Sequence, residues 1–144
     1  KNLTSTSNQS NKSNFALYLS TFKLQHILFK SNAYSAVVNE NVSQELKKDH
    51  TTCGFGIWFS SIGKEHFSDF KYFNDLDIHH KKYHELINKN LDCILNGECM
   101  SNTDNIDKTI ENFRQAEEHS NKFFDLLDKL AEDKGQNVKM KDIV

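Results

Sequence analysis

The sequence contains no proline and only five glycines among its 144 residues. Proline interrupts helices and glycine weakens them, so the scarcity of both favours long, continuous helices. Cysteine is also scarce: the chain has three, an odd number without the spacing of a disulfide framework. Such usage is typical of proteins in a reducing compartment. We therefore expect an all-α protein located in the cytoplasm.

The sequence also lacks long apolar runs and a large charge of either sign. No stretch approaches the roughly 18 apolar residues that a membrane span needs, and no signal peptide is visible. The formal net charge of -2 excludes the strongly basic field that nucleic-acid-binding proteins usually carry. We expect neither membrane insertion nor nucleic-acid binding.

The composition changes along the chain in a way that predicts one domain between two polar ends. Residues 1–14 are rich in Ser, Thr, Asn and Lys, so they bury little apolar surface and are predicted to be a linker. Residues 15–134 are long enough for a domain with its own core. Residues 135–144 begin at a glycine and are predicted to be a flexible tail. The first residue, Lys1, is not Met, which suggests a part of a longer protein.

Apolar side chains recur at steps of three and four along three long stretches, which predicts amphipathic helices. Between the first two stretches, a glycine-containing segment and a threefold phenylalanine spacing predict two shorter helices. The predicted helices cover residues 15–42, 53–63, 64–74, 75–94 and 103–134. The predicted fold is an antiparallel four-helix-type bundle with a short extra helix.

Three histidines lie on the apolar faces of these helices. His26 belongs to the stripe of the first helix, and His80 and His84 lie four positions apart on the inner face of the helix over 75–94. Residues four apart project from one helical face, so these two imidazoles can share one metal ion. Taken singly, each histidine is also explained as a core residue that is hydrogen-bonded to a neighbour.

Cys53 begins a short segment with the sequence Cys-Gly-Phe-Gly-Ile-Trp. The exposed N–H groups of a helix N-terminus lower the pKa of a thiol, which favours the thiolate that a metal requires. The alternative is that Cys53 is a buried cysteine that acts as a small apolar residue.

Three imidazoles and one thiolate, from His26, Cys53, His80 and His84, complete a tetrahedral ligand set for Zn²⁺. Other chemistries fit these residues less well. A metalloprotease needs glutamate directly after the first of two histidines, and Lys81 stands there. A di-iron bundle needs carboxylates close after its histidines, and no residue four positions after a histidine is acidic. A Cys–His protease dyad needs an orienting residue, and the sequence identifies none. We predict a buried zinc site without an open position for water, and therefore no enzyme.

The ligand segments resemble those of the chemoreceptor zinc-binding domain family. The family pattern has three phrases: His-x-x-aromatic, Cys-x-hydrophobic-Gly-x-aromatic and His-x-x-x-His. Here the first phrase is His26 with Phe29, the second lies within residues 53–58, and the third is His80 with His84. Phe29 stands where tryptophan is frequent in the family. The resemblance extends over about residues 15–134.

The resemblance implies a cytoplasmic sensory module that binds zinc through three histidines and one cysteine and acts as a homodimer. Such domains most often lie at the C-terminus of bacterial chemotaxis receptors, and less often they are joined to diguanylate cyclases. Some respond to zinc, and others to oxidants such as hypochlorous acid through the zinc-bound cysteine. A signalling module is therefore expected on the N-terminal side of residues 1–14.

Two further features of the sequence bear on regulation. The Phe/Leu stripe of the last helix is more than one small bundle is expected to cover, which favours a homodimer. Cys93 and Cys99 could act as resolving thiols for an oxidised Cys53, although both are also explained as ordinary cysteines near a helix end. The alternative to sensing is a structural zinc-stabilised dimerisation domain.

Overall fold

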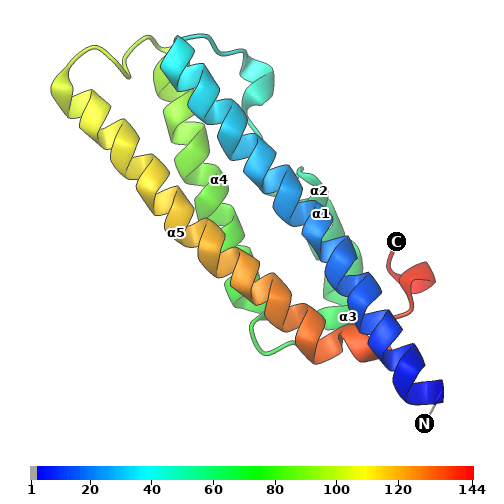
Figure 1. Ribbon diagram of the computed structural model, residues 1–144. Helices are drawn as coiled ribbons and strands as arrows, with labels where there is room; N and C mark the ends of the chain where they lie inside the picture. The colour runs from blue at the N-terminus through cyan, green and yellow to red at the C-terminus, as the bar shows by residue number, and fades with distance from the viewer. Residues whose placement is uncertain (1–2) are drawn as a thin grey trace.

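A computed structural model describes residues 3–144 of the chain. Three long helices run side by side: α1 (Leu3–Asn39), α4 (Phe73–Leu95) and α5 (Thr103–Lys134) (Figure 1). A fourth, shorter rod consists of α2 (Gly54–Trp58), a π-helical turn (Phe59–Gly63) and α3 (Lys64–Phe67). Consecutive rods run in opposite directions, and residues 3–144 contain no strand. The predicted all-α antiparallel bundle is confirmed.

The first helix is longer at its N-terminus than the sequence indicated. We predicted a start at residue 15, but α1 begins at Leu3. The polar residues of this extension find partners on the end of α5 and on the tail: Lys12 pairs with Glu132 at 2.5 Å, and the Asn11 side chain donates to the carbonyl oxygen of Gln136. These polar contacts therefore stabilise the part of α1 before residue 15, which has few apolar side chains to bury. Residues 1 and 2 lie outside the described part of the chain, and a linker role for 1–14 stays a prediction.

Other predicted boundaries shift by small amounts. The first helix ends at Asn39 rather than near residue 42, because Glu40 adopts a left-handed backbone with φ of 50°, a common way for a helix to end. The helix predicted over 64–74 is only α3 followed by turns. The helices predicted over 75–94 and 103–134 match α4 and α5 closely.

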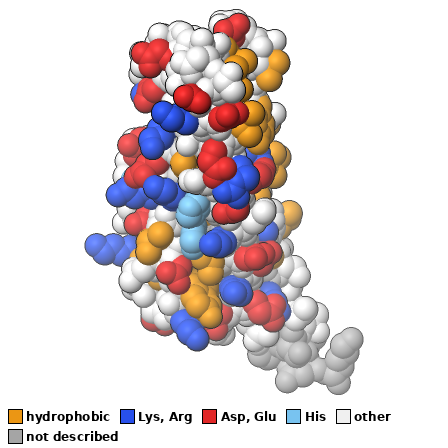
Figure 2. Space-filling view, turned by 90° about the vertical axis from the view of Figure 1, so that its left-hand side faces the viewer, with side chains coloured by type: hydrophobic (Ala, Val, Ile, Leu, Met, Phe, Trp, Pro, Cys, Tyr) orange, Lys and Arg blue, Asp and Glu red, His pale blue; other side chains and the backbone are white. Residues whose placement is uncertain are grey.

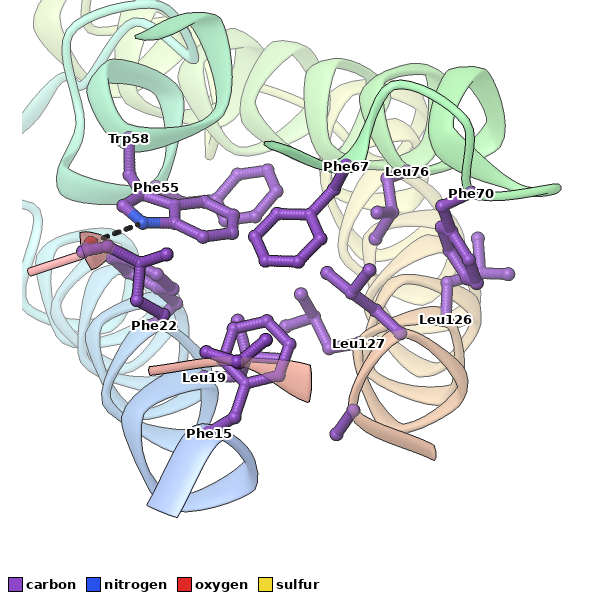
Figure 3. Packing of buried hydrophobic residues seen from close by; sticks show 14 of the residues in the cluster. Phe15, Leu19, Phe22, Phe55, Trp58, Phe67, Phe70, Leu76, Leu126 and Leu127 are labelled. Carbon is purple, nitrogen blue, oxygen red and sulfur yellow. Dashed lines mark hydrogen bonds between the residues drawn. The ribbon is translucent and has the colours of Figure 1, made fainter. Parts of the chain in front are cut away.

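The core consists of two apolar clusters separated by a layer of histidines. One cluster lies towards the chain termini and combines aromatic rings with leucines (Figure 3); its aromatic members include Phe15, Phe22, Phe55, Trp58, Phe67 and Phe123. The other lies towards the α4–α5 loop and includes Phe29, Ala33, Tyr83, Ile87, Leu91 and Phe113. His26 falls between the α1 residues of the two clusters, so the metal-ligating candidates sit in the middle of the bundle.

The C-terminal tail, which we predicted to be flexible, packs against the bundle. It forms two short 3-10 turns, Gly135–Asn137 and Met140–Asp142. The side chains of Val138 and Ile143 are buried. The indole N–H of Trp58 donates to the carbonyl oxygen of Ile143 at 3.1 Å, a contact that Figure 3 marks. The tail therefore closes the open end of the aromatic cluster.

The surface agrees with the modest net charge. On the face in Figure 2, basic and acidic side chains are interspersed, histidines lie among lysines, and hydrophobic side chains gather along one edge. Within residues 3–144, each helix is too short or too polar to cross a bilayer.

Candidate metal centre

Three separate parts of the chain bring the four predicted side chains to one point. His26 comes from the middle of α1, Cys53 is the N-cap residue of α2, and His80 and His84 come from adjacent turns of α4. One ligand atom from each of the four lies within 4.8 Å of all the others. Among the described residues, this is the group of metal-ligating side chains that could hold an ion.

Four of the six distances between the ligand atoms are close to those around a tetrahedral metal. Zinc–nitrogen bonds of about 2.0–2.1 Å and zinc–sulfur bonds of about 2.3 Å place tetrahedral ligand atoms roughly 3.3–3.6 Å apart. Nε2 of His26 lies 2.9 Å from Nε2 of His80 and 3.1 Å from Nε2 of His84. The sulfur of Cys53 lies 3.2 Å from Nε2 of His80 and 3.8 Å from that of His26.

The backbone decides which nitrogens carry protons. Nδ1 of His26 lies 2.6 Å from the carbonyl oxygen of Phe22, and Nδ1 of His84 lies 2.7 Å from that of Lys48. A carbonyl oxygen only accepts, so each Nδ1 carries the hydrogen and each neutral Nε2 has a lone pair. Two lone pairs that face each other at 3.1 Å repel unless a cation lies between them. This pairing of Nδ1 with a carbonyl is the usual support of a metal-ligating histidine.

Burial keeps the three imidazoles neutral. His26, His80 and His84 are each at most 2% exposed. Desolvation, the largest cause, lowers the pKa of all three, and the neighbouring histidines lower those of His80 and His84 further. The pKa of His84 falls to about 4. Neutral imidazole is the form that binds metal ions, so the site favours a cation over protons near neutral pH.

Comparison with known families agrees with this geometry. Residues 26–91 match the family model of the chemoreceptor zinc-binding domain. The matched segment begins at His26 and contains all four candidate ligands. No curated protein and no solved structure gives a match. The predicted resemblance is confirmed over these residues, a shorter stretch than the 15–134 that we expected, and zinc is the metal of this family.

Aromatic rings form the walls of the candidate metal centre. Phe55 packs edge-on to His80 with ring centroids 4.8 Å apart, and Phe123 packs against His26 at 5.2 Å. Phe29, the aromatic residue of the first family phrase, stacks on His84 at 4.9 Å. These contacts hold the imidazole planes and exclude water from one side of the site.

Cys53 differs from the histidines because it reaches the surface. It is half-buried, and with Gln25, Asn32 and His84 it lines an open pocket of about 660 Å³. The backbone N–H of Gly56 donates to its sulfur at 3.4 Å. We predicted that the helix N-terminus would lower the pKa of this thiol, but burial outweighs the backbone hydrogen bonds and raises it. The thiolate therefore depends on a metal rather than on the helix.

Gly56 explains the glycine of the second family phrase. A Cβ atom at this position would lie 1.8 Å from the carbonyl oxygen of His50, far inside van der Waals contact. Only glycine lets the loop before Cys53 cross the first turn of α2 so closely. The sequence predicted a close approach of the backbone at this glycine, but it did not identify His50 as the residue that approaches.

Several supporting contacts could not be found from the sequence. The hydroxyl of the buried Tyr83 donates to the carbonyl oxygen of His26, which ties α4 to α1 beside the site. Outside the site, His79 and His119 face each other with 3.0 Å between their Nδ1 atoms. The carbonyl partners of His26 and His84 are backbone groups, which carry no side-chain signal.

Cys93 and Cys99 are bonded to each other rather than available to Cys53. They form a disulfide between the end of α4 and the loop that follows it. Cys93 lies nine residues beyond His84, about 13 Å along the helix axis. The suggested role of these cysteines as resolving thiols for Cys53 is therefore wrong in this structure.

Proposed function

We propose that this domain is a cytoplasmic sensory module that binds one Zn²⁺ through His26, Cys53, His80 and His84 and responds to oxidants at Cys53. The observation that carries the proposal is the difference in exposure within the cluster. The three imidazoles are at most 2% exposed, although His26 and His84 border the same open pocket, whereas the side chain of Cys53 is half-buried at the pocket wall. A small oxidant that enters this pocket meets the sulfur at its wall.

The proposed reaction takes place at the sulfur of Cys53. Bound zinc supplies the charge that keeps this sulfur a thiolate at neutral pH. The thiolate attacks hypochlorous acid, forms a sulfenic acid and releases chloride, so that sulfur is oxidised and chlorine is reduced. A sulfenic acid is a weaker ligand than a thiolate, so Cys53 separates from the three histidines.

The packing around α2 supports a route from Cys53 to the rest of the domain. Cys53 caps α2, which ends at Trp58, and the indole of Trp58 is bound to the tail and packed against Phe15 of α1. Release of Cys53 removes the fixed point at the start of this short helix. The aromatic cluster then repacks, and α1 passes the change to a signalling module on its N-terminal side.

The host that we propose is a bacterial chemotaxis receptor, with a diguanylate cyclase as the alternative. Both follow from the family, whose members are sensory and regulatory zinc-binding domains rather than known catalysts. Four protein ligands leave no open position for water on a tetrahedral zinc, which supports a regulatory role over hydrolysis.

A homodimer is part of the proposal, but through a different surface from the one that we predicted. Most of the stripe of α5 is covered within the chain: Phe113, Phe123 and Leu127 are buried, whereas Ile110 is 61% exposed. The exposed apolar surface of α5 is therefore limited to its N-terminal part, around Ile110.

The outer face of α1 offers that surface instead. The inner stripe of α1 is buried. The outer face carries five exposed apolar side chains: Leu17, Leu24, Ile27, Tyr34 and Val38. Leu24 follows Leu17 by seven residues, and Tyr34 follows Ile27 by seven, which is the repeat of a coiled-coil seam. A second copy of α1 packed along this seam would cover it. The same seam favours the second candidate function, a zinc-stabilised dimerisation domain.

Oxidation of zinc-loaded protein tests the sensing function. About one equivalent of hypochlorous acid should release zinc and shift the Trp58 emission to the red, because a metal-held thiolate is the most susceptible sulfur. A variant with both Cys93→Ser and Cys99→Ser should respond like the native chain, and Cys53→Ala should not respond to the oxidant. An equal response in Cys53→Ala would show that Cys53 is not the sensing atom and would favour the structural role.

A further inference from the structure

The disulfide partners are brought together by the backbone as well as by their bond. Cys93 lies in the last turn of α4, and Cys99 lies six residues later in the α4–α5 loop, with 5.0 Å between their Cα atoms. The loop turns at Gly97, whose φ is 71°. The backbone N–H of Gly97 donates to Ile94, and that of Glu98 donates to Cys93 at 2.9 Å. These bonds need no disulfide, so the two sulfurs stay neighbours when reduced.

The two cysteines have different surroundings. Cys99 is 1% exposed, and its sulfur faces the carbonyl oxygen of Asn90 at 3.5 Å. Cys93 is half-buried and lines an open pocket of about 390 Å³ together with Lys89, Lys108 and Glu98. Two lysines against one glutamate leave the pocket positive, which favours a thiolate on Cys93. Cys93 is therefore placed to meet a solvent oxidant first, with Cys99 behind it.

We propose that Cys93 and Cys99 form a second, reversible redox centre that reacts with hydroperoxides independently of the zinc site. The thiolate of Cys93 attacks one oxygen of hydrogen peroxide, breaks the O–O bond and becomes a sulfenic acid, and the leaving hydroxide takes up a proton to form water. The thiol of Cys99 then attacks the sulfenic sulfur and expels a second water. Overall, two thiols and one peroxide give one disulfide and two waters. A cellular dithiol reverses the step by thiol–disulfide exchange.

The compartment supports reversibility. In the cytoplasm proposed above, thiol reductants keep most cysteines reduced. The disulfides that form there are usually transient and are catalytic or redox-sensing. A separation of six residues with a turn already in place suits a bond that opens and closes without a large rearrangement.

The state of this pair would control the junction between α4 and α5. The side chain of Asn90 is buried; it donates to the carbonyl oxygen of Thr109 at 3.0 Å and accepts from Asn112 at 3.0 Å. The side chain of Asn105, in the first turn of α5, donates to the carbonyl oxygen of Glu98 at 2.9 Å. Oxidation fixes the loop between these contacts. Reduction frees it, and the loop before α5 then exchanges its amide hydrogens faster.

Non-reducing peptide mapping of the zinc-loaded protein tests the proposal. After reduction and removal of the reductant, hydrogen peroxide should join the peptides of Cys93 and Cys99, and dithiothreitol should separate them again. The zinc content should stay constant, and amide exchange over residues 94–102 should slow by about tenfold on oxidation. The same link should form in Cys53→Ala. In Cys99→Ser, a sulfenic-acid probe should label Cys93.

Three outcomes would overturn the proposal. The first is that peroxide leaves both thiols free. The second is that the disulfide joins either cysteine to Cys53. The third is a link that dithiothreitol does not reduce in the folded protein, which would make it a permanent structural bond. Failure of the hypochlorous acid response at Cys53 would leave this centre unaffected, because the mapping follows different peptides.

Discussion

At the scale of single residues, backbone carbonyl oxygens set the chemistry of the candidate ligands. The oxygens of Phe22 and Lys48 hold the protons of His26 and His84 on Nδ1 and turn both Nε2 atoms towards one point. Burial keeps the rings neutral, and the same burial raises the pKa of Cys53. The set is therefore suited to a cation that supplies positive charge without a proton.

Removal of either α4 histidine should abolish tight zinc binding. His80→Ala and His84→Ala each leave three ligands. The zinc affinity should fall by more than about 100-fold, since even the loss of a group that hydrogen-bonds to a metal ligand costs about 10–100-fold. His119→Ala is the matched control, because His119 is a partly buried histidine outside the cluster. Elemental analysis after dialysis gives the zinc content, and a fully loaded His80→Ala/His84→Ala double variant would contradict the assignment.

The metal-free domain should lose stability in acid. The pKa of His84 is about 4 in the folded chain, against an ordinary value of 6.5, and the pKa values of His26 and His80 are also lowered. Below pH 6.5 the unfolded chain binds more protons than the folded one, so stability present above that pH is lost as the pH falls towards 4. His84 alone accounts for on the order of 3 kcal/mol. Urea unfolding between about pH 4.5 and 7.5, at one constant salt concentration, measures the free energy of unfolding. A free energy that does not change with pH would contradict the buried neutral imidazoles.

At the scale of elements, the short helix α2 is positioned by the loop that crosses it. The carbonyl oxygen of His50 rests on Gly56, and the side chain of Asp49 accepts from the backbone N–H of Thr51 at 2.7 Å. Together these contacts bring Cys53 to the end of α2 that faces α1 and α4. The glycine is therefore part of the metal centre, although it contributes no ligand.

Gly56→Ala should displace Cys53 and weaken zinc binding. The added Cβ would lie 1.8 Å from a backbone oxygen, so the loop has to move. Gly54→Ala is the matched control, because there the nearest atom is the end of the flexible Gln25 side chain at 2.6 Å, which can turn away. We expect a loss of zinc affinity of about tenfold or more for Gly56→Ala and little change for Gly54→Ala. Competition with a chromophoric chelator measures both, and equal affinities would show that the loop is not constrained at Gly56.

At the scale of the whole molecule, α1 carries apolar residues on two faces. Its inner face joins both core clusters, from Phe15 to Val37, and its outer face carries the exposed seam that begins at Leu17. Only the inner face is covered within the bundle. The candidate metal centre lies near the middle of the same helix, on its inner face, where His26 is buried.

Leu24→Glu should weaken the homodimer without unfolding the domain. Leu24 is 57% exposed at the middle of the seam, so a charge there costs little in the monomer but opposes pairing. Ile78→Glu is the matched control, since Ile78 is 56% exposed on α4, away from α1. The dimer dissociation constant should rise by about tenfold or more in Leu24→Glu alone, which corresponds to about 1.4 kcal/mol. Sedimentation at several concentrations measures it, and a monomeric native chain would contradict the dimer.

The sequence by itself determined the helical stripes and the four candidate ligands. Stripes follow from a local period of 3.6 residues, and His80 and His84 share a face because they are four apart on one helix. His26 and Cys53 could be joined to them because the family phrases are short and lie in a fixed order. None of these inferences needs the position of a distant residue.

The tertiary structure decided everything that depends on long-range contacts. Partners on α5 and the tail, Glu132 and Gln136, bind Lys12 and Asn11 in the part of α1 that precedes residue 15. Burial, rather than the helix N-terminus, sets the pKa of Cys53. The pairing of Cys93 with Cys99 depends on how the α4–α5 loop turns, and the outer seam of α1 is distinguished from its inner stripe only once the bundle has covered one of them. Local pattern predicts which faces are apolar, but only packing decides which of them meets solvent.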